Sequence, residues 1–348
     1  MNSYRIAVMG AGVIGQQHVK LLNQHPQTTL AALVDISEAG KAYAKEQSVP
    51  FYRDRVEMLD REKPDAVIIA LPNQLHVVAA QECISRGIPV LLEKPVADTL
   101  EAACCLVDIV EQSDIPVLVG HHRRHSPDIQ AAKRAIVAGK LGSLVAANGF
   151  CFVKKHDAYF EAQWRRKAGG GPVLINLIHD IDCFRYLCGE IVQVQAVTSN
   201  RARELEVEDT AAVTLKFANG ALGTLVISDA VPSPYCWDVV SGQALYLGKH
   251  RGDCYYIGGT EGTLAVPSLA LWRQQPGEDW RHPLVQHQLQ MELSNCYVNQ
   301  LQHFLCCIDG SASPLVSVRE GLQTLAATLA VSEAASRQSS VNIAELIA

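Results

Sequence analysis

The sequence predicts two domains: an N-terminal α/β domain with a doubly wound parallel sheet, and a C-terminal α+β domain with a mostly antiparallel sheet. Three observations carry this prediction. Strand-like and helix-like runs alternate through the first 120 residues, a glycine-rich turn follows the first strand directly, and from about residue 144 strand-like runs follow one another with little helix between them. A chain of 348 residues is long enough for two domains, and we place them at 1–121 and 122–348.

The elements of the N-terminal domain are short and regular. Apolar runs that predict strands lie at 4–9, 29–35, 65–71, 89–93 and 116–120. Helix-like runs fill the gaps at 13–24, 37–47, 74–86 and 99–112. Strands that are apolar throughout are typical of a parallel sheet covered by helices on both faces.

The C-terminal domain has a different pattern. Strands are predicted at 144–153, 191–199, 210–218, 221–229, 254–258, 262–266 and 269–273. Helices are predicted at 172–187, 289–308 and 317–336. Asn219-Gly220 separates two strands and favours a tight hairpin, whereas 231–253 has no clear period and is expected to be a long irregular loop.

Bulk composition excludes several classes of protein. The net charge is −6 and no long basic block is present, which argues against nucleic acid as a partner. No apolar run of 18 residues predicts a membrane span, and the first residues form a core strand rather than a signal peptide. The 11 cysteines include no C-x-x-C pair, so we expect reduced thiols and a cytoplasmic location.

The turn from Gly10 to Gly15 has the G-x-G-x-x-G pattern, with a strand before it and an amphipathic segment after it. The first glycine permits a tight turn, Gly12 lets a pyrophosphate approach, and the third allows close packing of helix and strand. Asp35 lies 20 residues past Gly15, where an acid can bind the adenosine ribose and repel a 2′-phosphate. The pattern predicts a Rossmann domain that binds NAD, with NADP less favoured, although Asp35 could also be a solvated turn residue.

Polar residues gather where the predicted parallel strands end, which is where ligands bind in such sheets. One strand ends at Leu71-Pro72-Asn73, with His76 a turn later, and another ends at Glu93-Lys94-Pro95. Lys94 could polarise a substrate hydroxyl or relay a proton. A surface lysine at a strand end explains it equally well on this observation alone.

A polar stripe is predicted on the helix that begins at Pro172, after three glycines from Gly169. Asn176, His179 and Asp182 recur at i, i+3 and i+6, with apolar residues around them. His179 suits a general base because an ordinary imidazole titrates near neutrality. The alternative is a core histidine held by Asp182, and the stripe below the glycines favours the functional interpretation.

A second basic group lies at 121–125, where His121, His122 and His125 surround Arg123 and Arg124. Adjacent histidines on a strand point apart and no carboxylate lies near in the sequence, so a metal site is not expected. Contacts to cofactor phosphate, substrate oxygens or a partner subunit are favoured. Trp164-Arg165 is a further candidate for positioning a ligand, or else a packed interface pair.

These residues and their order resemble the Gfo/Idh/MocA oxidoreductases, which include glucose-fructose oxidoreductase and inositol dehydrogenase. The resemblance covers nearly the whole chain and rests on the glycine turn, Glu93-Lys94-Pro95, Trp164-Arg165 and His179-x-x-Asp182. It implies catalytic roles for Lys94 and His179, and a sheet that forms contacts in a homodimer or homotetramer. Inositol dehydrogenase-like members have an aspartate four residues before the histidine, where this chain has Ile175. Asn176 can bind a hydroxyl but cannot take its proton.

The resemblance implies an NAD-dependent dehydrogenase that oxidises a secondary alcohol of a cyclic polyol, sugar or related ring. The expected catalytic residues are Lys94, His179 and Asp182, with Asp182 orienting the imidazole. The expected substrate-binding residues are Asn176, His122, Arg123, Trp164 and Arg165. The expected cofactor-binding residues are Gly10, Gly12, Val13, Ile14, Gly15, Asp35, Leu71, Pro72, Asn73, His76, Glu93 and Lys94. The alternatives are an aromatic cis-dihydrodiol dehydrogenase, an enzyme that retains NAD through hydrolysis or epimerisation, and a non-catalytic NAD sensor.

Overall fold

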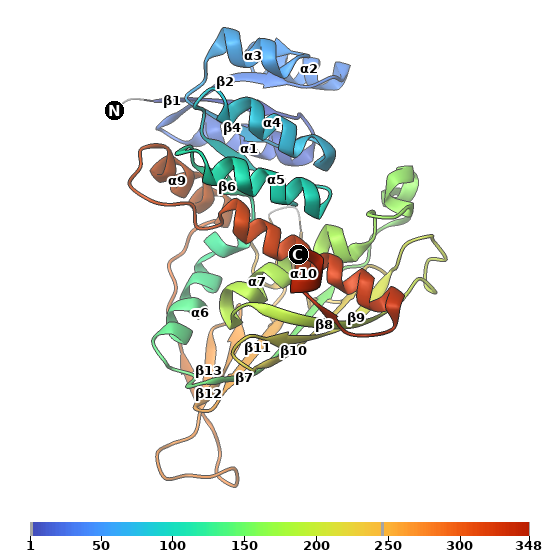
Figure 1. The fold of residues 1–348 in the computed structure, drawn as a ribbon. Coiled ribbons are helices and arrows are strands. Elements are labelled where there is room, and N and C mark those ends of the chain that lie inside the picture. Colours follow the sequence, from blue (N-terminus) through green and yellow to red (C-terminus); the bar gives the residue numbers. More distant parts are fainter. Residues whose placement is uncertain (1–2, 245–246, 348) are drawn as a thin grey trace. The chain divides into compact units, whose positions relative to one another are not determined.

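The computed structural model describes residues 3–244 and 247–347, which fold into two compact units (Figure 1). Unit 1 comprises residues 1–122 and 297–325, and unit 2 comprises 123–296 and 326–348. The predicted boundary between residues 121 and 122 lies one residue before the point where the chain first passes from unit 1 to unit 2. It was wrong for 297–325, because this segment returns to the N-terminal unit.

Unit 1 contains a six-stranded parallel sheet in the order β3-β2-β1-β4-β5-β6. Its strands are β1 Tyr4–Met9, β2 Thr28–Val34, β3 Phe51–Tyr52, β4 Ala66–Ile69, β5 Val90–Leu92 and β6 Val117–Val119. Its helices before residue 122 are α1 Val13–Gln24, α2 Glu38–Glu46, α3 Arg55–Glu62, α4 His76–Ile84 and α5 Leu100–Glu111. The residues of β4, β5 and β6 are buried on both faces of the sheet, which confirms the doubly wound sheet. The pattern missed the two-residue strand β3 and the largely polar helix α3.

The segment 297–325 completes unit 1 at its edge strand β6. It carries most of α9 (Cys296–Ile308) and the first turns of α10 (Val318–Arg337). The backbone N–H of Val119 donates to the carbonyl of Val316 at 2.9 Å. Gly321 lies so close to β6 that a Cβ there would be 3.2 Å from the Val119 side chain. This packing is the physical reason for the corrected domain division.

Unit 2 contains a nine-stranded sheet in the order β14-β13-β12-β11-β7-β10-β9-β8-β15. The strands are β7 Leu144–Phe152, β8 Ile191–Ser199, β9 Thr210–Phe217, β10 Leu222–Ser228, β11 Tyr255–Gly259, β12 Gly262–Val266, β13 Ala270–Arg273, β14 Val285–Gln288 and β15 Val341–Asn342. Among the strands that the structure describes in this sheet, only β10 and β7 pair in parallel. The sheet is therefore mostly antiparallel, as predicted. Asn219-Gly220 joins β9 to β10, and Gly220 adopts a φ of +88°.

One face of this sheet carries helices. The predicted helix at 172–187 is a π-helical turn, Val173–Leu177, continued by α7, Ile178–Cys188. Helix α7 packs on β7 and against α6, Pro127–Val137, which the sequence pattern missed. The predicted loop 231–253 contains the short helix α8, Trp237–Val240, and its residues 245–246 lie outside the described residues. A short helix α11, Ala344–Ile347, follows β15.

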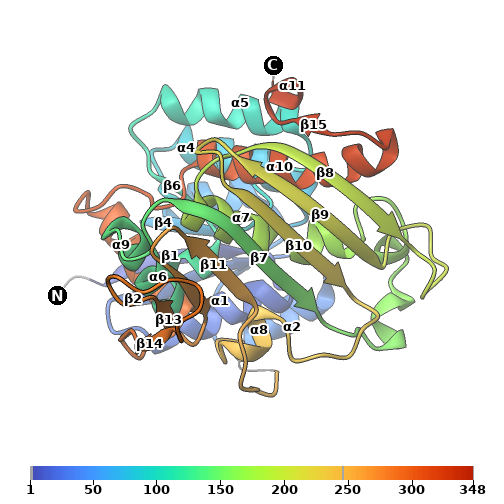
Figure 2. The same ribbon diagram turned by 90° about the horizontal axis from the view of Figure 1, so that it is seen from below.

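The other face of the sheet is bare in the described part of the chain, and Figure 2 looks onto it. A row of uncharged side chains crosses five neighbouring strands there, as the register shows. The row consists of Gln195, Thr214, Thr224, Asn148 and Tyr256. Among the helices that the structure describes, none combines the length and apolar character needed to cross a membrane.

Candidate active site

The glycine turn after β1 has the geometry that a bound pyrophosphate needs. Gly10 has a φ of +103°, and a Cβ there would be 2.3 Å from the carbonyl oxygen of Ala70. A Cβ on Gly15 would be 1.9 Å from the carbonyl oxygen of Gly10, whereas one on Gly12 would meet nothing within 4 Å. Helix α1 begins with no side-chain cap and no acid in its first turn. The open Gly12 and the free helix start therefore fit a dinucleotide phosphate.

Residues around this turn differ in how well the structure supports their predicted roles. Val13 is 85% exposed, and Ile14 is also exposed, so both are open to a ligand. The Asp35 carboxylate accepts the N–H of Ala11 at 2.7 Å and the N–H and hydroxyl of Ser37. Burial raises the pKa of Asp35, but these hydrogen bonds outweigh it and the net shift is downward. Asp35 thus fastens the glycine turn to the end of β2, and its contact with ribose stays a prediction.

His76 holds two strand-end loops together. Its ring nitrogens lie 2.8 Å from the carbonyl oxygen of Pro95 and 2.9 Å from that of Leu71. The ring is buried, and burial lowers its pKa against the opposing effect of these contacts. His76 therefore shapes these loops through its ring, and its predicted contact with the cofactor stays a prediction. Pro72 is exposed and Asn73 opens a short 3-10 turn, Asn73–Leu75, so their predicted contacts stay open.

Lys94 follows β5 and is half-buried, and its peptide bond to Pro95 is cis. Glu93 before it is buried, and one carboxylate oxygen lies 2.8 Å from Nε2 of His18 on α1. The other oxygen accepts the backbone N–H of Lys94 at 3.3 Å. The carboxylate of Glu93 is engaged within unit 1, and the predicted contact of this residue with the cofactor stays a prediction. Sequence reasoning missed His18, because its partner Glu93 lies 75 residues further along the chain.

His122 lies at the end of unit 1 and is buried. Its ring stacks on Tyr297, with centroids 4.3 Å apart and planes 15° apart. The predicted contact of His122 with substrate is therefore not supported by its packing, since one face of the ring is taken by tyrosine.

In unit 2, the three glycines let two loops approach each other closely. Gly169 has a φ of +84°, and a Cβ on Gly170 would be 2.2 Å from the carbonyl oxygen of Trp164. Arg165 lies over the Tyr159 ring at 3.8 Å, and Trp164 is 56% exposed. The loop is thereby held while the indole remains open to a ligand. The predicted substrate contacts of Trp164 and Arg165 stay predictions.

The polar stripe is interrupted by the π-helical turn. Asn176 lies in this turn and is half-buried, whereas His179 lies in the first turn of α7 and is 8% exposed. The backbone N–H of Val173 donates to Glu208 at 3.0 Å, so a carboxylate from outside the stripe caps the segment. Turns of π-helix are frequent at functional sites because they redirect side chains.

Asp182 has a partner that the sequence did not predict. Its two carboxylate oxygens accept from Nε and an Nη of Arg124 at 2.9 and 2.8 Å, and both side chains are buried. This bidentate ion pair ties the start of unit 2 to α7. The predicted role of Asp182 in orienting His179 stays a prediction.

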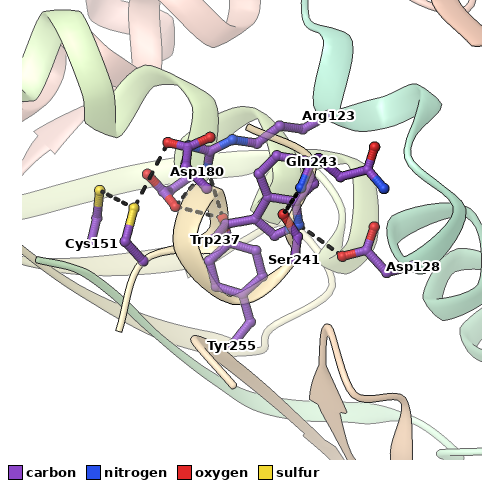
Figure 3. Close-up of polar contacts among 10 residues, drawn as sticks. Arg123, Asp128, Cys151, Asp180, Trp237, Ser241, Gln243 and Tyr255 are labelled. Atoms are coloured by element: carbon purple, nitrogen blue, oxygen red, sulfur yellow. Dashed lines mark hydrogen bonds and ion pairs between the residues drawn. The ribbon is translucent and has the colours of Figure 1, made fainter. Parts of the chain in front are cut away.

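Arg123 is also an interior residue whose polar atoms have partners within unit 2, and its predicted contact with substrate stays a prediction. Figure 3 shows its guanidinium among the side chains of Asp180, Trp237 and Tyr255. It donates to Asp180 at 2.9 Å, to Asp238 at 3.0 Å and to the Tyr255 hydroxyl at 3.0 Å, and it is 1% exposed. Burial lowers the pKa of Arg123, but the two carboxylates outweigh it and raise the pKa well above its usual range.

No group of three or more potential metal ligands is found among the described residues. The expectation of no metal at 121–125 used the absence of nearby acids in the sequence. In the folded chain, Asp180, Asp182 and Asp238 do lie close to the arginines of this segment. These carboxylates are engaged in ion pairs with guanidinium groups.

Comparisons with known proteins agree with this geometry. The family model described as "Oxidoreductase family, NAD-binding Rossmann fold" matches residues 4–121, and the GFO/IDH/MocA C-terminal domain model matches 129–265. An inositol 2-dehydrogenase of Rubrobacter xylanophilus is 30% identical over 278 residues, which are 77% of this chain and 73% of that protein. The scyllo-inositol 2-dehydrogenase (NAD+) of Bacillus subtilis is 28% identical and covers 90% of this chain and 88% of its own.

Solved structures show the same fold. An oxidoreductase of Agrobacterium radiobacter, determined with NAD+, L-tartaric acid and magnesium, has a TM-score of 0.81 at 20% identity and covers 99% of both chains. The fold and the glycine turn define an NAD-binding oxidoreductase with a Rossmann unit. The chain belongs to the Gfo/Idh/MocA family, as the two family models and its dehydrogenase relatives show.

Proposed function

We propose that this chain is an NAD-dependent dehydrogenase that oxidises a secondary alcohol of a cyclic polyol or sugar, with Lys94 and His179 as its acid–base pair. The observation that carries the proposal is the position of Lys94. It follows β5, which adjoins β4 and then β1, and β1 ends at the glycine turn. Ligands of parallel sheets bind at this edge of the strands. Relatives named as inositol dehydrogenases and as D-apiose dehydrogenase support the substrate class.

The reaction removes two hydrogens from the alcohol in different forms. NAD held at the glycine turn after β1 would supply the acceptor for the hydride that leaves the carbinol carbon. The His179 imidazole accepts the hydroxyl proton, and the two electrons of the O–H bond form the second bond of the ketone. The Lys94 ammonium donates a hydrogen bond to the same oxygen and stabilises its alkoxide character. In the reverse direction His179 returns the proton to a ketone oxygen.

Two further residues of unit 2 suit a hydroxylated ring. Asn176 has both a donor and an acceptor for a neighbouring hydroxyl, and the exposed Trp164 offers an apolar face to ring carbons. Ile175 stands where inositol dehydrogenase-like members have an aspartate, so His179 carries the proton transfer without that carboxylate. Asp182, held by Arg124, fixes the helix that presents His179.

A substrate panel with two variants tests the proposal. Inositols, sugars, sugar acids and dihydrodiols are screened for NADH formation, and the best alcohol is used for kinetics. We expect Lys94→Ala and His179→Ala each to lower kcat/KM by about 10²–10⁴-fold, while the Kd for NAD changes little.

Two exposed residues of the same types provide controls, Lys20→Ala and His282→Ala. Full turnover in the Lys94 or His179 variant would remove that residue from the catalytic role. NAD that stays bound through purification would favour the hydrolase or epimerase that retains its cofactor. NADH formation with dihydrodiols alone would favour the aromatic cis-dihydrodiol dehydrogenase.

A further inference from the structure

A buried histidine on α1 reaches the residue that precedes Lys94. Nε2 of His18 lies 2.8 Å from Oε1 of Glu93, and the two side chains are 3% and 9% exposed. His18 lies one turn past Gly15, so the helix that starts at the glycine turn also carries this imidazole. A pair this deep in the fold costs desolvation, and it persists because each partner satisfies the other.

The surroundings of Glu93 leave its carboxylate little freedom. A Cβ on Gly120 would be 3.1 Å from the Glu93 carboxyl group, so this glycine provides the space for it. The second carboxylate oxygen accepts the backbone N–H of Lys94. One carboxylate therefore joins the imidazole of α1 to the backbone of the lysine that follows β5.

The charges that face Glu93 come from three segments. Burial raises the pKa of Glu93, whereas the hydrogen bond from His18 and the positive charges of His18, His122 and Lys94 lower it, and the net shift is downward. His122 follows β6, His18 lies on α1, and Lys94 follows β5. With these neighbours the carboxylate stays ionised and remains an acceptor.

We propose that His18 is a positioning residue that acts through Glu93 to hold Lys94 at the end of β5. This inference rests on the proposed function of Lys94. It adds a link between the dinucleotide-binding helix and the lysine, because one ion pair joins the middle of α1 to Glu93, which follows β5 and precedes Lys94. His18 itself has no contact with reacting atoms in this scheme.

Three variants separate positioning from general stability. His18→Leu removes the imidazole, His18→Gln keeps an amide donor near the Nε2 position, and Gln17→Leu is a matched control on the same helix. Glu93 is followed by ¹³C NMR of labelled glutamate, assigned with Glu93→Gln, in protein without substrate. We expect His18→Leu to raise the pKa of Glu93, because the hydrogen bond and charge of His18 no longer oppose the effect of burial.

The second readout is the reactivity of Lys94. Competitive acetylation with acetic anhydride, followed by mass spectrometry, measures the rate at which each lysine is acetylated. In His18→Leu the rate for Lys94, relative to the other lysines, should change by about threefold or more. His18→Gln should recover most of the wild-type value, and Gln17→Leu should match wild type. If His18→Leu does not fold, the same two measurements on His18→Gln should show a smaller shift in the same direction.

Kinetics with the best alcohol of the panel complete the test. His18→Leu should lower kcat about tenfold with the Kd for NAD within threefold of wild type. Unchanged Glu93 titration, Lys94 reactivity and kcat would overturn the positioning role. Normal turnover of Lys94→Ala would instead overturn the proposed function, so the two failures can be told apart.

Discussion

Both units place a buried ion pair beside a proposed acid–base residue, but the cations differ. In unit 1 the partner of Glu93 is the imidazole of His18, and in unit 2 the partners of Asp180 and Asp182 are the guanidinium groups of Arg123 and Arg124. A guanidinium stays positively charged in proteins, and that of Arg124 binds Asp182 through two hydrogen bonds. The support of the His179 helix is therefore a permanent, bidentate pair, whereas the support of Lys94 rests on a single contact between His18 and Glu93.

The largest expected effect comes from breaking the permanent pair. Arg124→Met leaves the buried carboxylate of Asp182 without its cation, and we expect the free energy of unfolding to fall by about 3–5 kcal/mol. Urea unfolding measures it. Arg337→Met removes an exposed i,i+4 pair with Glu333 and should cost about 0.5 kcal/mol or less. A loss below about 1 kcal/mol for Arg124→Met would mean that α7 does not depend on this ion pair.

A smaller effect separates backbone strain from ligand contact within unit 1. Gly10→Ala should lower the free energy of unfolding by at least about 1–3 kcal/mol, because its φ of +103° strains any residue with a Cβ. Gly12→Ala has open space and should keep near wild-type stability, yet weaken NAD binding by about tenfold or more. Calorimetry gives both quantities. Equal NAD affinity of Gly12→Ala and wild type would place the pyrophosphate elsewhere.

The smallest effect on stability is expected on the bare face of the unit 2 sheet. We propose that copies of the chain associate as a homodimer or homotetramer through this face, because an uncharged row crosses it at Gln195, Thr214, Thr224, Asn148 and Tyr256. Thr214→Glu should change the free energy of unfolding of one chain by only about 0.5 kcal/mol. Light scattering should show its mass falling to that of one 37.8 kDa chain.

Gln112→Glu, at the exposed end of α5, is the control for added charge and should keep the wild-type mass. The proposal that this face forms the subunit contact would be wrong if the wild-type chain is already monomeric. It would also be wrong if the Thr214→Glu variant keeps the mass of a dimer or tetramer.

Sequence patterns predicted what depends on local backbone geometry. The glycine turn, the strand β2 that comes after α1, and Asp35 could be located because they all lie within about 25 residues of chain. Most of the strands and the longer helices followed from their apolar period. The mostly antiparallel sheet of unit 2 was predicted because strand-like runs follow one another with little helix between them and Asn219-Gly220 favours a hairpin, but the strands β14 and β15 were missed.

Residue roles that depend on distant partners could not be predicted in the same way. Arg123 and His76 are residue types that often bind ligands. The folded chain shows instead that the guanidinium of Arg123 donates to Asp180 and Asp238. It also shows that the ring of His76 lies between two backbone carbonyl oxygens. The pair of His18 with Glu93 spans 75 residues, so no spacing rule reveals it. The return of 297–325 to unit 1 is also a long-range event.

That return has a practical consequence for protein engineering. A recombinant fragment that stops at residue 121 would lack the Val316 carbonyl that pairs with Val119, and it would lose the α10 surface at Gly321. Its last strand would then be an open edge, which invites pairing with other molecules. Transplanting the NAD-binding part into another scaffold therefore requires two separate pieces of the gene, joined by a new linker.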